Sequence, residues 1–175
     1  FWVGSMDRKG VEPVGSLFRV DPDLGVTRMA QGFVVSNGIA FSPDDRVLYH
    51  TDSRRGLIYA WDFDIEAGGI ENHRVFLDYG AGDVRPDGCT VDSEGYLWVC
   101  EIGAWRVGRF DPEGRRDRSV ALPVQRPASL AFGKPDGSGR IALSDNRSPH
   151  LAWADAPAGT RSFAILCIDP DVPTV

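Results

Sequence analysis

The sequence predicts an all-β chain that folds as part of a β-propeller. Residues 36–53 (SNGIAFSPDDRVLYHTDS) and residues 86–102 (PDGCTVDSEGYLWVCEI) repeat one order of elements: a small polar residue, glycine, an apolar strand, a polar turn and a second apolar strand. Gly88 follows Gly38 after 50 residues, and Ser129 begins a third copy 41 residues later. A period of about 40–50 residues with four strands per unit is typical of propeller blades.

Strand signals are dense throughout, because short runs of Val, Ile, Leu and aromatic residues alternate with Gly, Pro, Asp and Asn. In chain order the expected strands are residues 1–6, 15–22 and 26–32; then 38–42, 46–52, 57–63 and 73–79; then 88–92, 96–102, 106–112 and 117–123; then 129–133 and 140–145. The chain should therefore be an open fragment of two complete and two partial blades. A β-sandwich is the alternative, but whole strand–turn–strand phrases recur here, which favours the propeller.

Composition limits the possible partners and compartments. The 175 residues are 42% hydrophobic and 25% charged, which predicts a packed core in one domain, or in a domain with part of another. A net charge of −6 argues against nucleic acid as a partner. The sequence contains no apolar run of about 18 residues, so no membrane-spanning helix is predicted. The first residues, FWVGSMDRKG, have no signal-peptide layout and begin inside an expected strand, so we expect the natural N-terminus to lie upstream.

The three cysteines, Cys89, Cys100 and Cys167, have no metal-ligand spacing. Cys89 and Cys100 lie in apolar strand segments, where a cysteine is usually a small buried side chain. This is consistent with a reducing compartment and a cytoplasmic location. G-x-S-x-G, P-loop and H-E-x-x-H motifs are absent, and the three histidines stand far apart. We expect His50 to be a core or channel-lining residue.

Two residues with side-chain oxygen donors occupy the same position in neighbouring units. In a propeller the first strand of every blade lines the central channel, so the loops that precede these strands meet at one mouth. Asn37 and Asp87 should therefore converge there, and their oxygens suit a hard divalent cation. In the third copy this position is Ala128, which supplies no ligand. Asn-Gly and Asp-Gly are also good turn dipeptides, which is the simpler alternative.

Three acidic residues end the second strand of their units: Asp52, Glu101 and Asp145. They should lie near the same mouth, where their negative potential would help attract a cation. Asp52, in the blade of Asn37, is the best placed to support a ligand from behind. The alternative is that all three are solvated turn residues.

These repeated phrases, together with FWVGSMD and GSLFRVDPDLGVTRM, resemble the senescence-marker-protein, gluconolactonase and luciferin-regenerating-enzyme (regucalcin-like) family over residues 1–144. The resemblance implies a six-bladed propeller that hydrolyses sugar lactones and related lactones with one divalent cation and no organic cofactor. Ca²⁺ is the first choice, with Zn²⁺, Mg²⁺ or Mn²⁺ as alternatives. The resemblance also implies that Asn37 and Asp87 are metal ligands and that Asp87 is the general base.

The sequence departs from that family at its beginning. The family's N-terminal blades, with their Glu ligand and their substrate-binding Arg and Asn, have no counterpart in this sequence. We therefore expect the lactone hydrolase activity to be impaired in this chain. The alternatives are a non-catalytic propeller for calcium binding or protein interaction, and an inactive junction fragment.

A second departure divides the chain into residues 1–145, the partial propeller, and residues 146–175, a foreign tail. The phrases SPHLAW, APAGTRSFAI and DPDVP resemble the start of the phosphatidylethanolamine-binding protein family. That resemblance implies a role for Asp169, Pro170 and Asp171 in lining an anion pocket. Residues 161–169 are apolar enough to dock on 129–133 or 140–145, although loose packing is the favoured expectation.

Overall fold

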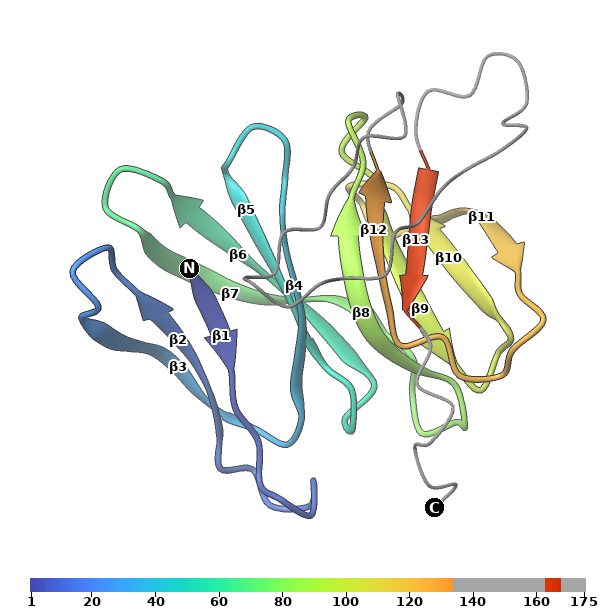
Figure 1. The fold of residues 1–175 in the computed structure, drawn as a ribbon, viewed down its shortest axis with the longest axis horizontal. Coiled ribbons are helices and arrows are strands. Elements are labelled where there is room, and N and C mark those ends of the chain that lie inside the picture. The colour runs from blue at the N-terminus through green and yellow to red at the C-terminus, as the bar shows by residue number, and fades with distance from the viewer. Residues whose placement is uncertain (134–162, 168–175) are drawn as a thin grey trace, which may run out of the picture.

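The chain is an all-β structure of antiparallel sheets, seen in a computed structural model that describes residues 1–133 and 163–167 (Figure 1). The strands are β1 (Trp2–Gly4), β2 (Gly15–Val20), β3 (Val26–Phe33), β4 (Ser36–Phe41), β5 (Val47–Asp52), β6 (Leu57–Asp64), β7 (Gly69–Asp78), β8 (Arg85–Val91), β9 (Leu97–Ile102), β10 (Arg106–Phe110), β11 (Arg116–Ala121), β12 (Ser129–Gly133) and β13 (Phe163–Cys167). Within this described part, no helix is long and apolar enough to cross a membrane.

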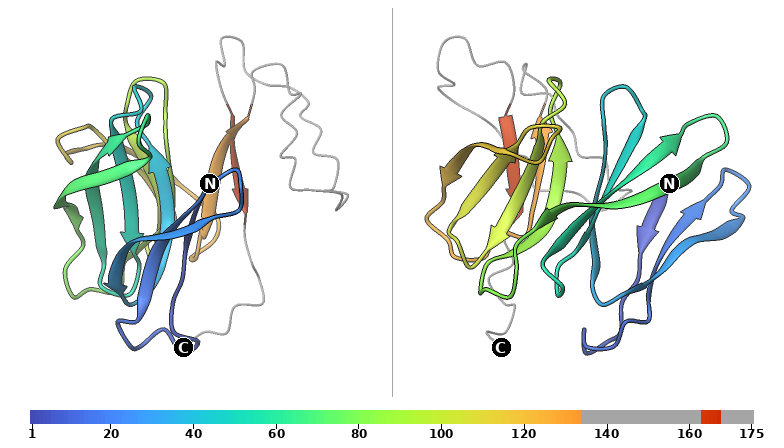
Figure 2. Two further views of the ribbon diagram at one scale, coloured as in Figure 1. Left: turned by 90° about the vertical axis from the view of Figure 1, so that its left-hand side faces the viewer. Right: turned by 180° about the vertical axis from the view of Figure 1, so that it is seen from behind.

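Both complete blades are confirmed. Strands β4, β5, β6 and β7 form one four-stranded sheet in chain order, and β8, β9, β10 and β11 form a second. Strands β1, β2 and β3 form a three-stranded sheet before them. The sheets fan out side by side (Figures 1 and 2), and their inner strands meet in chain order, β1 with β4, β4 with β8, and β8 with β12.

The last sheet contains a strand from the C-terminal part of the chain. Strand β13 pairs antiparallel with β12, from Ser129 opposite Cys167 to Gly133 opposite Phe163. Residues 163–167 thus pair with residues 129–133, one of the two expected partners, and the expectation that this segment packs loosely stays a prediction. The other expected partner, residues 140–145, lies outside the described residues.

The apolar core lies between sheets. One layer joins the first sheet to the second, a second layer joins the second sheet to the third, and a third layer joins the third sheet to β12. Side chains of β5 alternate between two of these layers, with Leu48 in the first and Tyr49 in the second. Both faces of this strand are therefore buried, including its polar residues His50, Thr51 and Asp52.

Matched β-bulges interrupt the inner strands β4 and β8. In β4, Ser36 pairs with Asp52 and Ile39 pairs with His50, so β4 carries one extra residue. The same shift occurs in β8, between Pro86 and Cys89. Asn37-Gly38 and Asp87-Gly88 are these bulges. The expectation that they are ordinary turn dipeptides is therefore wrong.

The bulge glycines let neighbouring inner strands come very close. A Cβ on Gly38 would lie 2.4 Å from the Asp87 carbonyl oxygen, and one on Gly88 would lie 2.6 Å from that of Ala128. The Gly88 amide also donates a 2.8 Å hydrogen bond to the Ala128 carbonyl. Any side chain at these positions would push the blades apart.

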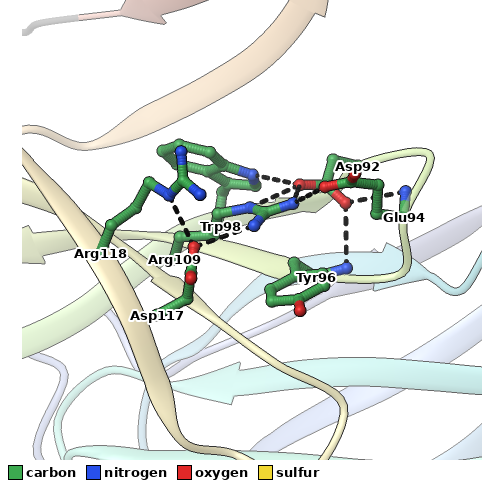
Figure 3. Close-up of polar contacts among 7 residues, drawn as sticks. All are labelled: Asp92, Glu94, Tyr96, Trp98, Arg109, Asp117 and Arg118. Atoms are coloured by element: carbon green, nitrogen blue, oxygen red, sulfur yellow. Dashed lines mark hydrogen bonds and ion pairs between the residues drawn. The ribbon is translucent and has the colours of Figure 1, made fainter.

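A buried arginine ties together the turn and outer strands of the third sheet (Figure 3). The Arg109 guanidinium donates to Asp92 at 2.8 Å and to Asp117 at 2.9 Å, and it also pairs with Glu94. Its carbon Cζ lies 3.7 Å from the Tyr96 ring centroid. Arg109 thereby links the β8–β9 turn to β11, the fully exposed outer strand.

Replacing Arg109 with Met should lower the free energy of unfolding by about 2–4 kcal/mol, because Asp92 would keep a poorly solvated charge without its partner. Urea titration measures this change. Arg118→Met is the matched control, because Arg118 also pairs with Asp117 but is 63% exposed, and its loss should cost less than about 0.5 kcal/mol. Equal losses in the two variants would contradict a special role for the buried arginine.

Gly38→Ala should destabilise the chain by about 2–4 kcal/mol, because the added methyl group meets backbone atoms of the next blade that cannot move aside locally. Thermal unfolding tests this. In the control Gly82→Ala, nothing lies within 4 Å of the added methyl, so a gain of about 0.4–1 kcal/mol is expected from the stiffer unfolded chain. A neutral Gly38→Ala would show that the blades can separate at no cost.

Candidate functional site

The two matched bulges bring Asn37 and Asp87 into contact. The Asn37 side-chain amide, through Nδ2, donates a hydrogen bond to Oδ1 of Asp87, although the residues are 50 positions apart. Each side chain is half-buried at the start of an inner strand. The two side chains do converge, as the repeat led us to expect, and their role as metal ligands stays a prediction.

The Asp87 carboxyl lies in a poorly solvated place. Burial raises its pKa to about 6, although the Asn37 side chain, the Gly88 amide and the charge of Arg126 act in the opposite direction. No Lys or Arg side chain forms an ion pair with Asp87 among the described residues. The ionised carboxylate is therefore short of positive charge.

The donor set fits a hard divalent cation, but only in part. An amide oxygen and a carboxylate suit Ca²⁺, Mg²⁺ or Mn²⁺, and a cation would relieve the poorly compensated charge of Asp87. Ca²⁺ takes about 6–8 oxygen ligands, so two side chains leave most of its coordination to other donors. Within residues 1–133 and 163–167, no three His, Cys, Asp or Glu side chains gather in a metal-binding arrangement.

An open pocket adjoins this pair. Its volume is about 340 Å³, and inner strands of four neighbouring sheets contribute to its wall. Its lining residues are Trp2, Val3, Gly4, Ser36, Asn37, Gly38, Ile39, Gly88, Cys89 and Ser129. This volume is in the range of small-molecule sites, but the pocket is an open hollow, and Asn37 lines it while Asp87 does not.

Asp52 and Glu101 are fully buried, so the expectation that they are solvated turn residues is wrong. Asp52 accepts hydrogen bonds from the backbone amides of Val34, at 2.9 Å, and Val35, at 3.0 Å, which lead into β4. These bonds fix the segment just before Ser36. Within the described chain Asp52 makes no hydrogen bond or ion pair with Asn37 or Asp87, so support of a metal ligand by Asp52 stays a prediction.

Glu101 belongs to a different charge cluster. It accepts hydrogen bonds from Tyr79 at 3.0 Å and Arg116 at 2.6 Å, and it pairs with Arg106. Burial would raise the pKa of the Glu101 carboxyl, but the guanidinium groups outweigh burial and hold that pKa below its usual value. With two guanidinium partners, its charge adds little negative potential at the mouth. Asp145, Asp169, Pro170 and Asp171 lie outside the described residues.

Beside the pocket is a polar pair that sequence reasoning missed. The Ser36 hydroxyl lies 2.6 Å from Nε2 of His50. His50 is fully buried, as expected for a core residue, and burial lowers its pKa to about 4, so the ring is neutral at pH 7. One signal in the sequence hinted at this pair. Ser36 stands where the next two blades have Pro86 and Pro127.

Cys89 and Cys100 are free, buried thiols, which confirms their expected role as small core side chains. Burial raises the pKa of both thiols to about 12, so neither is a reactive thiolate at neutral pH.

Similar proteins share this architecture. A zebrafish (Danio rerio) regucalcin is 38% identical over 135 residues, covering 77% of this chain and 46% of the relative. A Pseudomonas putida 6-deoxy-6-sulfogluconolactonase is 36% identical over 141 residues, covering 78% and 47%. The crystal structure of a calcium-binding regucalcin from Agrobacterium tumefaciens superposes with a TM-score of 0.73 at 28% identity, covering 82% and 51%. The chain spans about half the length of the curated relatives it matches.

Two family profiles match the chain. The phosphatidylethanolamine-binding protein profile matches residues 123–175, which include the phrases that resemble that family. The SMP-30/Gluconolactonase/LRE-like profile matches residues 1–139, most of the chain and both complete blades. With its repeated propeller sheets and regucalcin relatives, the chain belongs to the SMP-30/gluconolactonase/LRE-like family.

Proposed function

We propose that this chain carries two ligands and the general base of a divalent-metal-dependent lactone hydrolase that acts on sugar lactones. The observation that carries the proposal is the contact between Asn37 and Asp87, made from matched bulges beside a pocket. The gluconolactone derivative in the name of the Pseudomonas putida relative supports a sugar lactone as substrate. Ca²⁺ is the preferred cation because the Agrobacterium relative is a calcium-binding protein.

The chemistry assigned to Asp87 is proton transfer. Its carboxylate takes a proton from a water molecule as the water oxygen bonds to the lactone carbonyl carbon. The ring C–O bond then breaks, and the same proton passes to the departing ring oxygen, which gives the open hydroxy acid. Without a cation the pKa of Asp87 is about 6, and a bound divalent cation would lower it further, so the carboxyl would be ionised at neutral pH and able to accept the proton.

Asn37 contributes orientation. Its amide holds one oxygen of Asp87, which leaves the second oxygen free to accept the proton. A divalent cation bound by these two residues would polarise the lactone carbonyl.

We also infer a cytoplasmic location, which the free thiols of Cys89 and Cys100 support.

A calcium-binding propeller without catalysis is the second candidate, supported by the description of the Agrobacterium relative. In both cases we expect a weak site, with a dissociation constant for Ca²⁺ of about 1 mM or higher, because only two protein ligands are present. Calorimetry that found tight Ca²⁺ binding would contradict this expectation.

The activity test follows the opening of sugar lactones with a pH indicator, with Ca²⁺, Zn²⁺, Mg²⁺ or Mn²⁺ and with a chelator. We expect slow, cation-dependent hydrolysis that falls at least about 100-fold in Asp87→Asn, which cannot accept the proton. Glu113→Gln is the control, because Glu113 is 64% exposed and outside the site. Cation binding without hydrolysis would favour the second candidate. Absence of both would leave the inactive-fragment reading.

Stability should depend on pH through Asp87. Its folded pKa, about 6, lies above its ordinary 3.8, so the folded state favours the protonated form. Its stabilising contribution is therefore complete below about pH 3.8 and is lost as the pH rises through about 6. Asp87→Asn keeps a neutral side chain, so it should be more stable than the parent at pH 7.5 by about 1–2 kcal/mol, a value reduced for partial exposure.

Urea titrations at pH 4 and pH 7.5, without divalent cations, measure this difference. At pH 4 the two proteins should be nearly equal in stability. A variant that was less stable than the parent at pH 7.5 would show that the Asp87 charge is well compensated.

A further inference from the structure

The bulge that presents Asn37 is a weak point in the sheet. The pairing of β4 with β5 is regular at Ser36 and again from Ile39, but Asn37 and Gly38 have no partner in β5. A bulge leaves its extra residue outside the ladder, and glycine adds conformational freedom. The hydrogen bond to Asp87 holds the end of the Asn37 side chain, so what the ladder leaves unfixed is the backbone that presents it.

The contact between Ser36 and His50 bridges this bulge. Ser36 lies directly before it, and His50 pairs with Ile39, the first regular position after it. The 2.6 Å contact between the Ser36 hydroxyl and His50 Nε2 therefore connects the residue before the bulge to the β5 residue that pairs just after it. The backbone between these two fixed points carries Asn37.

The His50 ring is itself held firmly. It is fully buried, and it packs edge-on against Phe33, with ring centroids 4.4 Å apart, and parallel to Tyr59, at 6.4 Å. Its other nitrogen, Nδ1, is buried without a hydrogen-bond partner among the described residues. An unpaired buried polar atom costs stability, and an apolar side chain would avoid that cost. The contact of Nε2 with Ser36 gives a reason for histidine here.

The next blade handles the same position differently. Pro86 pairs with Glu101 as Ser36 pairs with Asp52, and Val99 faces Cys89 as His50 faces Ile39. The ring of Pro86 fixes φ just before the Asp87 bulge, so that blade needs no hydrogen bond to stiffen the backbone. A third blade also has a proline there, Pro127, which is fully buried like Pro86.

We infer that His50 is a positioning residue that acts through Ser36 to fix the bulge and thus aim Asn37 at Asp87. The inference deepens the proposed function, since it concerns the same site, but it can be tested without a cation. Its prediction is that loss of the Ser36–His50 contact makes the Asn37 side chain mobile while the fold remains.

The test measures the heteronuclear NOE of the Asn37 side-chain amide by ¹⁵N NMR of the whole chain. The amide should be rigid in the parent and mobile in Ser36→Ala and in His50→Leu. Since the contact is shared, the double variant should be no more mobile than His50→Leu alone. His50→Gln can still hydrogen-bond to Ser36, so it should restore part of the rigidity. If His50→Leu does not fold, Ser36→Ala and His50→Gln decide.

Val99→Ala is the matched control, since Val99 occupies the position of His50 in the next blade. It should lower the urea midpoint without changing the Asn37 amide signal. The inference would be overturned if the Asn37 amide were as rigid in a folded Ser36→Ala variant as in the parent. It would also be overturned if Val99→Ala, which only lowers stability, made the Asn37 amide equally mobile.

A calcium titration separates this inference from the proposed function. If Ca²⁺ binds, we expect its dissociation constant to rise about tenfold in Ser36→Ala and to recover partly in His50→Gln. If Ca²⁺ does not bind but Asn37 becomes mobile as predicted, the positioning role holds and the proposed metal site fails. Unchanged affinity in a Ser36→Ala chain that binds Ca²⁺ would overturn the positioning role.

Discussion

The close approach of the inner strands is the constraint on which the rest of this structure depends. Gly38 and Gly88 stand where any side chain would meet the backbone of the following blade. Because the strands are so close, residues that are 50 positions apart can make direct side-chain contact. The same approach allows a hydrogen bond from Gly88 to Ala128, which links the third sheet to the strand pair beyond it.

The site follows from this constraint together with the bulges. An inner strand without a bulge would place Asn37 in register with β5, as an ordinary member of the ladder. The bulge takes Asn37 and Asp87 out of their ladders, and the glycine after each one makes room for the neighbour. One two-residue unit, a polar residue followed by glycine, therefore supplies both the functional group and the space it needs.

Much of this arrangement could be predicted from the sequence, because the repeat has a direct geometric meaning. The strands of both complete blades and the meeting of Asn37 with Asp87 follow from matched positions in two copies. The environments of Asp52 and Glu101 could not be predicted in this way. A carboxylate at a strand end resembles a solvated residue, and the partners of Glu101 cannot be read from its strand: Tyr79 lies 22 positions away in the preceding blade, and Arg116 lies 15 positions away in the outer strand of the same blade. The Ser36–His50 contact was hidden for another reason: both residues lie in one copy, but the matching positions of the next copy are Pro86 and Val99, which form no such pair.

The apolar layers between the sheets have a consequence for how stability is distributed. Each layer is formed by two neighbouring sheets, so the packing free energy that stabilises a sheet is shared with its neighbours. The stability of the chain can therefore be described by nearest-neighbour interactions. In the described chain, three such layers serve four sheets. A closed ring has one junction for every blade, whereas an open row has one fewer. Ring closure therefore adds one more apolar layer between sheets without adding a blade. In an open row, the two outermost sheets have only one neighbour each, so they carry a larger share of local fluctuations than the sheets between them.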